Sequence, residues 1–185
     1  MYKGNVHLIL KHGLSQMMRL KRPWSGDDVR NRYEASYDIS ADDYLARRET
    51  YARKLPYRVG DEFIVRVSPL RNSMVGRMKI ADVIAALKPR TVCEVGSGAG
   101  TNLLLLANRF PDIAFSGFEL TASGTRLARA LQVRDLHDTR FGKDLRLTPE
   151  GRDAIGRIAF SEGSAYDLPC PDDAYDLVFT HSALE

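Results

Sequence analysis

The sequence is poor in several features that mark specialised classes of protein. Its two cysteines, Cys93 and Cys170, are too few for a disulfide scaffold and do not have the spacing of a metal site. We read both as reduced thiols of a cytoplasmic protein. No apolar run reaches the roughly 18 residues that a membrane-spanning helix needs. Lys11 and His12 interrupt the early apolar stretch, which argues against a secretory signal peptide.

The chain also has only a small excess of one sign of charge over the other. The formal net charge is +3, which is too small by itself to indicate a nucleic-acid partner. The composition is that of a globular domain, since 44% of the 185 residues are hydrophobic and 28% are charged. This length is enough for one core and a small appendage. No internal repeat or low-complexity segment interrupts the chain.

The most informative segment is residues 92–102, which read VCEVGSGAGTN. A short β-branched run contains Glu94, three glycines follow at alternate positions, and an apolar run covers 103–106. This pattern predicts a buried strand, a tight turn and the start of a helix. Glycines let a ligand approach the backbone, and a helix N-terminus offers unpaired N–H groups to an anion. The segment therefore predicts a cradle for a nucleotide-like ligand.

A second predicted strand covers residues 113–119 and ends in a carboxylate, Glu119, which lies 19 residues after Gly100. This position suits a residue at the carboxyl end of the neighbouring strand, where a carboxylate can accept hydrogen bonds from both ribose hydroxyls. The same geometry serves NAD, so Glu119 supports adenosine binding without separating the two cofactors. An ordinary helix-capping acid is the structural alternative.

The spacing of the glycines distinguishes between the possible nucleotide cofactors. A dinucleotide fingerprint, G-x-G-x-x-G, would need its last glycine at position 101, which is Thr101, whereas the third glycine here is Gly100. The pattern E-x-G-x-G-x-G from Glu94 to Gly100 resembles motif I of the class I S-adenosylmethionine-dependent methyltransferases. The resemblance implies S-adenosyl-L-methionine as cofactor and disfavours an NAD-dependent oxidoreductase.

A third stretch extends the resemblance. Residues 158–162 read as a strand, and 163–180 resemble the family segment G-D-A-x-x-L-P-F-x-D-x-x-F-D-x-V. In the family, the loop after the third strand touches the adenine. Ser164 stands where the family often has an aspartate, and serine is a weaker acceptor. Adenine recognition then shifts toward the Ala165 backbone and Tyr166, although Tyr166 equally fits an exposed loop position.

The resemblance implies a cofactor site at the carboxyl ends of the first three predicted strands, with the fourth strand ending beside the transferable methyl group. Its residues are Glu94, Gly96, Ser97, Gly98, Gly100, Asn102, Glu119, Leu120, Ser164, Ala165, Thr180 and His181. No metal is expected. His181 follows the fourth strand, near the expected methyl position, and histidine is a common general base. Shaping the methionine pocket is the alternative role for His181, so the catalytic residue is left open.

The resemblance implies an α/β fold with a Rossmann-like doubly wound sheet. The family sheet has seven strands, and four can be found here. The fourth, with the apolar run Leu177–Phe179, reads as buried on both faces. The sheet is thus expected to be incomplete after this strand and the natural protein to continue past Glu185, unless a partner chain completes it. A homodimer is left open. An isolated 185-residue chain is expected to be inactive or poorly soluble.

The chain is expected to divide into a helical preface or lid over 1–60 and an S-adenosylmethionine-binding domain over 61–185. Helices are predicted from Ser25, from near Ser40 through Leu55, and over 74–87, the last with Met74, Met78, Ala81, Ile84 and Leu87 on its apolar face. Residues 1–23 carry five basic side chains and no acidic one. They fit a helix packed on the domain, a lid or, least favoured, a membrane-surface or polyanion contact.

Two further helix starts are marked by caps. Thr121 is predicted to cap the helix that follows the second strand. Residues 134–157 form an extra polar segment, in which Thr148 and Pro149 read as a cap and a first-turn proline.

The implied chemistry is in-line transfer of the sulfonium methyl group to an oxygen or nitrogen nucleophile. The acceptor class left open is a small molecule, a sugar or a lipid-linked group. The fourth strand lacks the N/D-P-P-Y/F motif of enzymes that methylate nucleobase amino groups, so no nucleic-acid partner is expected. The alternative is a non-catalytic S-adenosylmethionine-fold protein that binds a partner through its helical preface.

Overall fold

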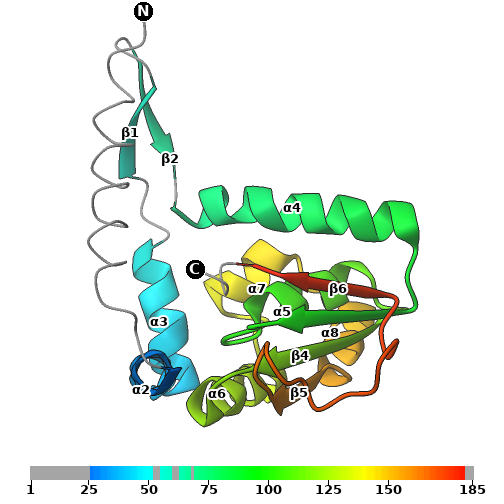
Figure 1. The fold of residues 1–185 in the computed structure, drawn as a ribbon. Helices are drawn as coiled ribbons and strands as arrows, with labels where there is room; N and C mark the ends of the chain where they lie inside the picture. The colour runs from blue at the N-terminus through cyan, green and yellow to red at the C-terminus, as the bar shows by residue number, and fades with distance from the viewer. Residues whose placement is uncertain (1–25, 52–54, 60–62, 68, 182–185) are drawn as a thin grey trace, which may run out of the picture.

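The computed structural model describes residues 26–51, 55–59, 63–67 and 69–181 (Figure 1). The helices are α2 (Gly26–Tyr37), α3 (Ala41–Tyr51), α4 (Pro69–Leu87), α5 (Thr101–Arg109), α6 (Ala122–Val133), α7 (Arg140–Leu145) and α8 (Pro149–Gly156). The strands are β1 (Leu55–Val59), β2 (Phe63–Val67), β3 (Thr91–Val95), β4 (Ala114–Glu119), β5 (Ala159–Glu162) and β6 (Leu177–Thr180).

Four parallel strands form the central sheet in the order β5-β4-β3-β6. The chain moves outward from β3 through β4 to β5 and then returns to the other side of β3. This confirms the predicted Rossmann-like order, in which the direction of winding reverses beside the first strand. The register aligns Glu119 with Glu162 and Val95 with Thr180, so the carboxyl ends of all four strands share one edge. Helices α2 and α3 stand at this edge (Figure 1).

The hydrophobic core lies between one face of the sheet and the helices. Strand residues Val92, Phe115 and Phe160 contribute to it, together with buried side chains of α3, α4, α5, α6 and α8. A smaller cluster of Cys93, Val95 and Phe118 covers the opposite face. Residues of the loop between β5 and β6 pack on this second cluster: Leu168, Cys170 and Tyr175. The two cysteines are free thiols, as predicted.

Side-chain caps fix the starts of the helices that follow β4 and precede β5. The Thr121 hydroxyl accepts from the Gly124 N–H at the start of α6, and the Thr148 hydroxyl accepts from the Gly151 N–H at the start of α8. Pro149 occupies the first turn of α8. Both predicted caps are therefore confirmed.

The N-terminal region agrees only in part with the predicted helices. Helix α2 begins at Gly26, and Ser40 caps α3, with its hydroxyl accepting from the Asp43 N–H at 3.0 Å. The prediction that this second helix runs through Leu55 was wrong, because Leu55 begins β1, which pairs antiparallel with β2. Leu55 precedes Pro56, and a proline disfavours the helical conformation in the residue before it. The basic segment 1–23 lies outside the described residues.

Two apolar patterns are buried less than the sequence suggests. In α4, Ala81 and Ile84 are buried, but Met78 is 54% exposed and Leu87 is 62% exposed. The half-buried Arg77 shares a helix face with Ala81 and Ile84, at the spacing i, i+4, i+7. Burial of β6 on both faces was also wrong for the described structure: β6 pairs with β3, and Val178 is 52% exposed.

No helix in the described part of the chain combines the length and the apolar character that are needed to cross a bilayer.

Candidate functional site

The glycine turn after β3 has a backbone that only glycine adopts readily. Gly96, Gly98 and Gly100 have φ values of 76°, 54° and 72°, all in the left-handed region. The N–H groups of Gly96 and Ser97 donate to the Phe118 carbonyl at 2.8 and 3.0 Å, which ties the turn to β4. A side chain at Gly100 would lie 2.5 Å from the Phe160 ring. The backbone conformation favours glycine at all three positions, and the packing against Phe160 also requires it at Gly100.

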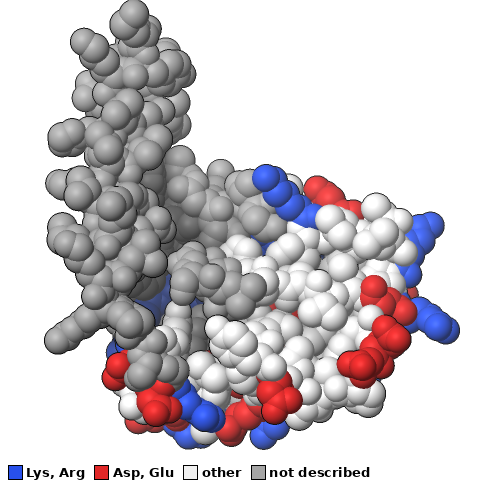
Figure 2. Space-filling model, viewed as in Figure 1, with Lys and Arg blue, Asp and Glu red and all other residues white. Residues whose placement is uncertain are grey.

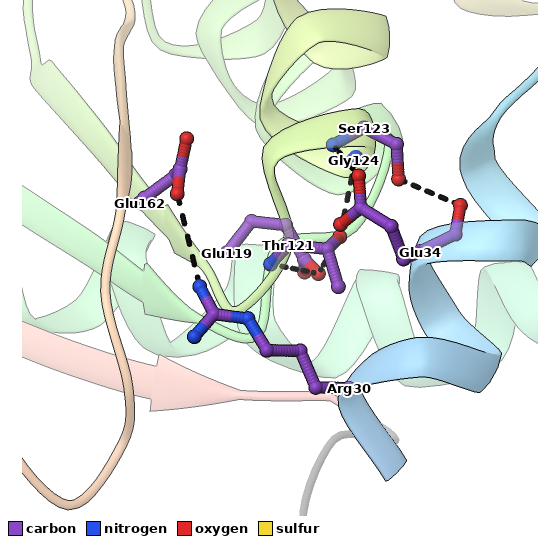
Figure 3. Close-up of polar contacts among 7 residues, drawn as sticks. All are labelled: Arg30, Glu34, Glu119, Thr121, Ser123, Gly124 and Glu162. Carbon is purple, nitrogen blue, oxygen red and sulfur yellow. Dashed lines mark hydrogen bonds and ion pairs between the residues drawn. The ribbon is translucent and has the colours of Figure 1, made fainter. Parts of the chain in front are cut away.

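A buried carboxylate at the end of the neighbouring strand accepts a hydrogen bond from the glycine turn. Glu119 ends β4, is 6% exposed, and accepts from the Gly98 N–H at 2.8 Å through Oε2. Its Oε1 accepts from the Thr121 N–H at 3.2 Å and from the Thr121 hydroxyl at 2.8 Å (Figure 3). A carboxylate has about four acceptor positions. Three are in use, so Glu119 retains capacity for a further donor from a ligand.

A second buried acid lies deeper, at the end of β3. Glu94 is 0% exposed, and its Oε1 accepts from Asn102 Nδ2 at 2.5 Å. Asn102 Oδ1 in turn accepts from Arg77 Nε at 2.6 Å, so an amide joins the acid to a guanidinium of α4. Glu94 Oε2 is buried without a partner in the described structure. Burial raises the pKa of Glu94 to about 8, so this carboxyl is mostly protonated at neutral pH.

Helix α2 places Tyr37 directly over the glycine turn. A Cβ added at Gly98 would collide with the Tyr37 hydroxyl. Burial, followed by the charge of Glu119, raises the pKa of Tyr37 well above its usual range, so the phenol stays protonated. Tyr33 stacks on Tyr37 with ring centroids 6.4 Å apart. Helix α2 thus forms one wall of the site.

Polar contacts join the N-terminal region to α6 and to the end of β5 (Figure 3). A Glu34 carboxylate oxygen accepts from the Ser123 N–H at 2.9 Å, and the buried Ser123 hydroxyl donates to the Glu34 carbonyl at 2.8 Å. Exposed ion pairs are Arg126–Asp38 at 2.8 Å, Arg134–Asp42 at 2.6 Å and Arg30–Glu162 at 3.9 Å. Figure 2 shows acidic and basic side chains next to one another along the lower rim of the face in view. Each exposed ion pair adds little stability, whereas the contacts of Glu34 involve the buried Ser123 and are screened less by solvent.

The structure brings Glu94, the three glycines, Asn102 and Glu119 together at one end of the sheet. The buried Ser97 belongs to the same turn, and Leu120, which follows Glu119, is half-buried.

The remaining predicted residues lie further along that edge. After β5, the Ser164 hydroxyl accepts from the Tyr166 N–H at 3.3 Å, Ala165 is exposed, and the Tyr166 side chain is fully exposed. At the end of β6, Thr180 is exposed and His181 is half-buried. The roles of these residues toward a cofactor stay predictions. In the described part of the chain, no group of three or more His, Cys, Asp or Glu side chains is placed to hold a metal ion.

Sequence reasoning missed the residues that reach the site from the N-terminal helices. Tyr37 comes from α2, Tyr44 and Arg48 from α3, and Arg77 from α4. A signal for Arg77 was present, because it falls on the same face of α4 as the buried Ala81 and Ile84. A charged residue on a core-facing row needs a polar partner, and here that partner is Asn102. Tyr37 carries no comparable local signal.

The known proteins to which this chain is similar include methyltransferases. No family model matches the chain. Ajmaline N-methyltransferase from Rauvolfia serpentina is 28% identical over 98 residues, which are 53% of this chain and 28% of that protein. The chain therefore spans little more than a quarter of the curated relative. This similarity agrees with the family resemblance drawn from the motifs.

Solved structures give weaker likenesses. An S-adenosylmethionine-dependent methyltransferase from Thiobacillus denitrificans, in complex with S-adenosyl-L-homocysteine, has a TM-score of 0.37 and 24% identity, covering 57% of this chain and 36% of that chain. A putative sarcosine dimethylglycine methyltransferase from Galdieria sulphuraria has a TM-score of 0.48 and 13% identity, covering 80% and 48%. At these TM-scores, the fold assignment rests on the strand order of this chain itself.

Proposed function

We propose that this chain is the cofactor-binding region of a class I S-adenosylmethionine-dependent methyltransferase. The enzyme transfers the cofactor's methyl group to an oxygen or nitrogen nucleophile of a small-molecule, sugar or lipid-linked acceptor. The observation that carries the proposal is the contact between Glu119 and the Gly98 N–H. It puts a buried carboxylate beside a left-handed glycine turn, at the reversal of strand order where α/β sheets bind ligands.

The residues of the site fit an adenosyl ligand with an amino-acid end. Glu119 would accept from the ribose, and the glycine turn would let the ligand approach the backbone. Asn102 of α5 and Glu94 of β3 lie beside the turn and would offer polar groups to the rest of the ligand. Tyr37 covers Gly98 and would exclude water from that side.

S-adenosylmethionine, when bound, supplies a methyl group on a sulfonium, and its sulfur leaves as a neutral thioether that needs no acid. The protein's task is therefore alignment of the acceptor and exclusion of water. An oxygen nucleophile would also need a base. His181, half-buried after β6, is the candidate for that role at the shared edge of the sheet.

A nitrogen acceptor is the first to test. The curated relative is named as an N-methyltransferase, and an uncharged amine attacks through its lone pair without prior loss of a proton. Amines and hydroxyl compounds should be compared as acceptors under the same conditions. Cofactor binding without transfer to any acceptor would support the alternative, a non-catalytic binding protein.

Gly98→Val tests the proposed site. A Cβ at Gly98 collides with the Tyr37 hydroxyl, and the backbone there has a φ of 54°, so the β-branched side chain would displace Tyr37 and distort the turn, and binding of S-adenosyl-L-homocysteine should be lost. Gly156→Ala is the matched control, because a Cβ there has no atom within 4 Å. A folded Gly98→Val protein that binds like the parent would place the site elsewhere. If Gly98→Val does not fold, Gly98→Ala makes the same comparison with a smaller side chain.

A further inference from the structure

The two cysteines of the sequence come together on one face of the central sheet. Cys93 lies in β3, is 0% exposed, and forms the smaller cluster with Val95 and Phe118. Cys170 lies in the loop of residues 163–176 between β5 and β6, is half-buried, and packs on this cluster. The two residues are 77 positions apart, since 170 minus 93 is 77. The fold therefore places both thiols of the sequence in one cluster.

The two thiols differ in their access to solvent. Cys170 is half-buried, so a small oxidant can reach its sulfur from the surface. Cys93 is enclosed, and burial, followed by the nearby Cys170, raises the pKa of Cys93 to about 12. Since the thiolate is the reactive form, Cys93 is protected from direct oxidation at neutral pH. The pair thus has an order of reaction, in which an oxidant meets Cys170 first and Cys93 is the neighbouring thiol.

The loop holds Cys170 in a restricted position on the sheet. Pro169 and Pro171 flank it, and a proline fixes its own φ and restricts the residue before it. Further along the loop, the Tyr175 ring meets the Phe118 ring edge-on, with centroids 6.4 Å apart. Cys170 therefore has few backbone conformations to lose, which lowers the entropy cost of joining its sulfur to a neighbouring one.

We propose that Cys93 and Cys170 form a redox switch, which hydrogen peroxide closes into an internal disulfide. In the first step the Cys170 thiolate attacks a peroxide oxygen, the O–O bond breaks, and a sulfenic acid and hydroxide form. In the second step the Cys93 sulfur attacks the Cys170 sulfur, and the hydroxyl group leaves with the Cys93 proton as water. The two thiols lose two electrons, and the peroxide, with the protons of both thiols, becomes two molecules of water. The inference goes beyond the proposed function and requires no cofactor.

Closing the switch changes how the loop is attached to the sheet. In the reduced protein the loop between β5 and β6 is held on the sheet by the packing of Leu168, Cys170 and Tyr175. The disulfide adds a covalent tie to β3 and closes a segment of 77 residues. Such a cross-link restricts the unfolded chain and so stabilises the folded one. The oxidised protein should therefore melt several degrees higher than the reduced protein, and a dithiol reductant should reverse the change.

Tryptic digestion without reductant detects the disulfide directly. Cleavage after arginine places Cys93 in the peptide 91–109 and Cys170 in the peptide that begins at Ile158. Neither 91–109 nor 158–185 contains methionine, so oxidation of methionine does not alter these masses. Folded protein that is treated with hydrogen peroxide and then alkylated should yield the two peptides joined, with a mass about 2 Da below the sum of their reduced masses. Reduction with dithiothreitol before digestion should separate them.

Two variants separate the steps. Cys170→Ser removes the thiol that reacts first, so peroxide should neither join the peptides nor raise the melting temperature. Cys93→Ala leaves Cys170 without a partner, so its sulfenic acid should accumulate and be trapped by dimedone on the peptide that begins at Ile158. If Cys93→Ala does not fold, the parent and Cys170→Ser decide the matter alone.

Separate peptides in the folded, peroxide-treated parent would overturn the inference, whether Cys170 is then intact or oxidised to the sulfinic acid. Joining of two copies of the same peptide would also overturn it, as would joining that occurs only after unfolding in urea. None of these results depends on cofactor binding, so a failure here leaves the proposed function intact.

Discussion

Replacing Glu94 by glutamine should make the stability of the unliganded protein less dependent on pH. Glu94 is buried at the end of β3, and its pKa is raised from 4.5 to about 8. The folded protein therefore binds one proton more than the unfolded chain between these two values. The free energy of unfolding falls as pH rises through that window, because ionising the buried carboxyl is unfavourable. Glutamine stays neutral and keeps an oxygen that accepts from Asn102.

The size of the effect follows from the two pKa values. They differ by 3.5, since 8 minus 4.5 is 3.5, and one pKa unit corresponds to about 1.4 kcal/mol. The upper bound is about 5 kcal/mol of stability lost by the parent between acidic and alkaline conditions. Between pH 5.5 and pH 8 the parent crosses about 2.5 of these units, because 8 minus 5.5 is 2.5, which is at most about 3.4 kcal/mol. Relaxation around the ionised carboxyl reduces this, so a loss of roughly 1–3 kcal/mol is expected in the parent over that range and little change in Glu94→Gln.

Urea unfolding without ligand, at pH 5.5 and pH 8.5, measures the effect. The parent should be clearly less stable at the higher pH, and Glu94→Gln should change little. Glu150→Gln, at an exposed position in the first turn of α8, serves as the control and should follow the parent. Equal pH dependence in the parent and Glu94→Gln would refute the assignment of a neutral buried carboxyl.

Other consequences follow from the contacts of β4 and β6. Glu119→Ala should weaken the binding of S-adenosyl-L-homocysteine by at most about 1.5–3 kcal/mol for each lost hydrogen bond. A dideoxyribose analogue should bind the parent and the variant with the same affinity. If the analogue binds the parent as tightly as S-adenosyl-L-homocysteine does, Glu119 is not the ribose ligand. Thr121→Val removes the α6 cap and a donor to Glu119, so urea unfolding should show a loss of roughly 1–2 kcal/mol that Thr121→Ser restores; an equal loss in both variants would contradict the hydroxyl's role. Asp176 accepts from the Arg90 and Thr91 N–H groups, which lowers its pKa; its stabilisation is present above the ordinary value of 3.8 and is lost as pH falls through the lower folded value. Asp176→Asn should therefore be less stable than the parent at neutral pH and approach it in an acid titration, whereas a constant difference would refute the linkage.

Local patterns predicted the features that depend on neighbours in the sequence. The glycine turn needs left-handed backbone at alternate positions, and three glycines announce it. The caps at Thr121 and Thr148 are recognised because their partners lie three residues ahead. Glu119 was found because parallel strands place their carboxyl ends at one edge.

Features set by distant parts of the chain could not be read in this way. Tyr37 reaches Gly98 across sixty residues, and no local pattern records that contact. Exposure of Val178 depends on which strands flank β6, which its apolar sequence does not state. Leu55 fits the apolar spacing of the preceding helix, but it stands directly before Pro56, which disfavours the helical conformation at Leu55.

Calorimetric titration of the chain with S-adenosyl-L-homocysteine, and separately with NAD, tests the central claim most directly. Both ligands carry a ribose that Glu119 could bind, so the comparison isolates the reading of the glycine turn. We predict one site for S-adenosyl-L-homocysteine, lost in Gly98→Val and kept in Gly156→Ala, and no binding of NAD at the same concentrations. Binding of NAD with no binding of S-adenosyl-L-homocysteine, by a protein that melts cooperatively, would contradict the account.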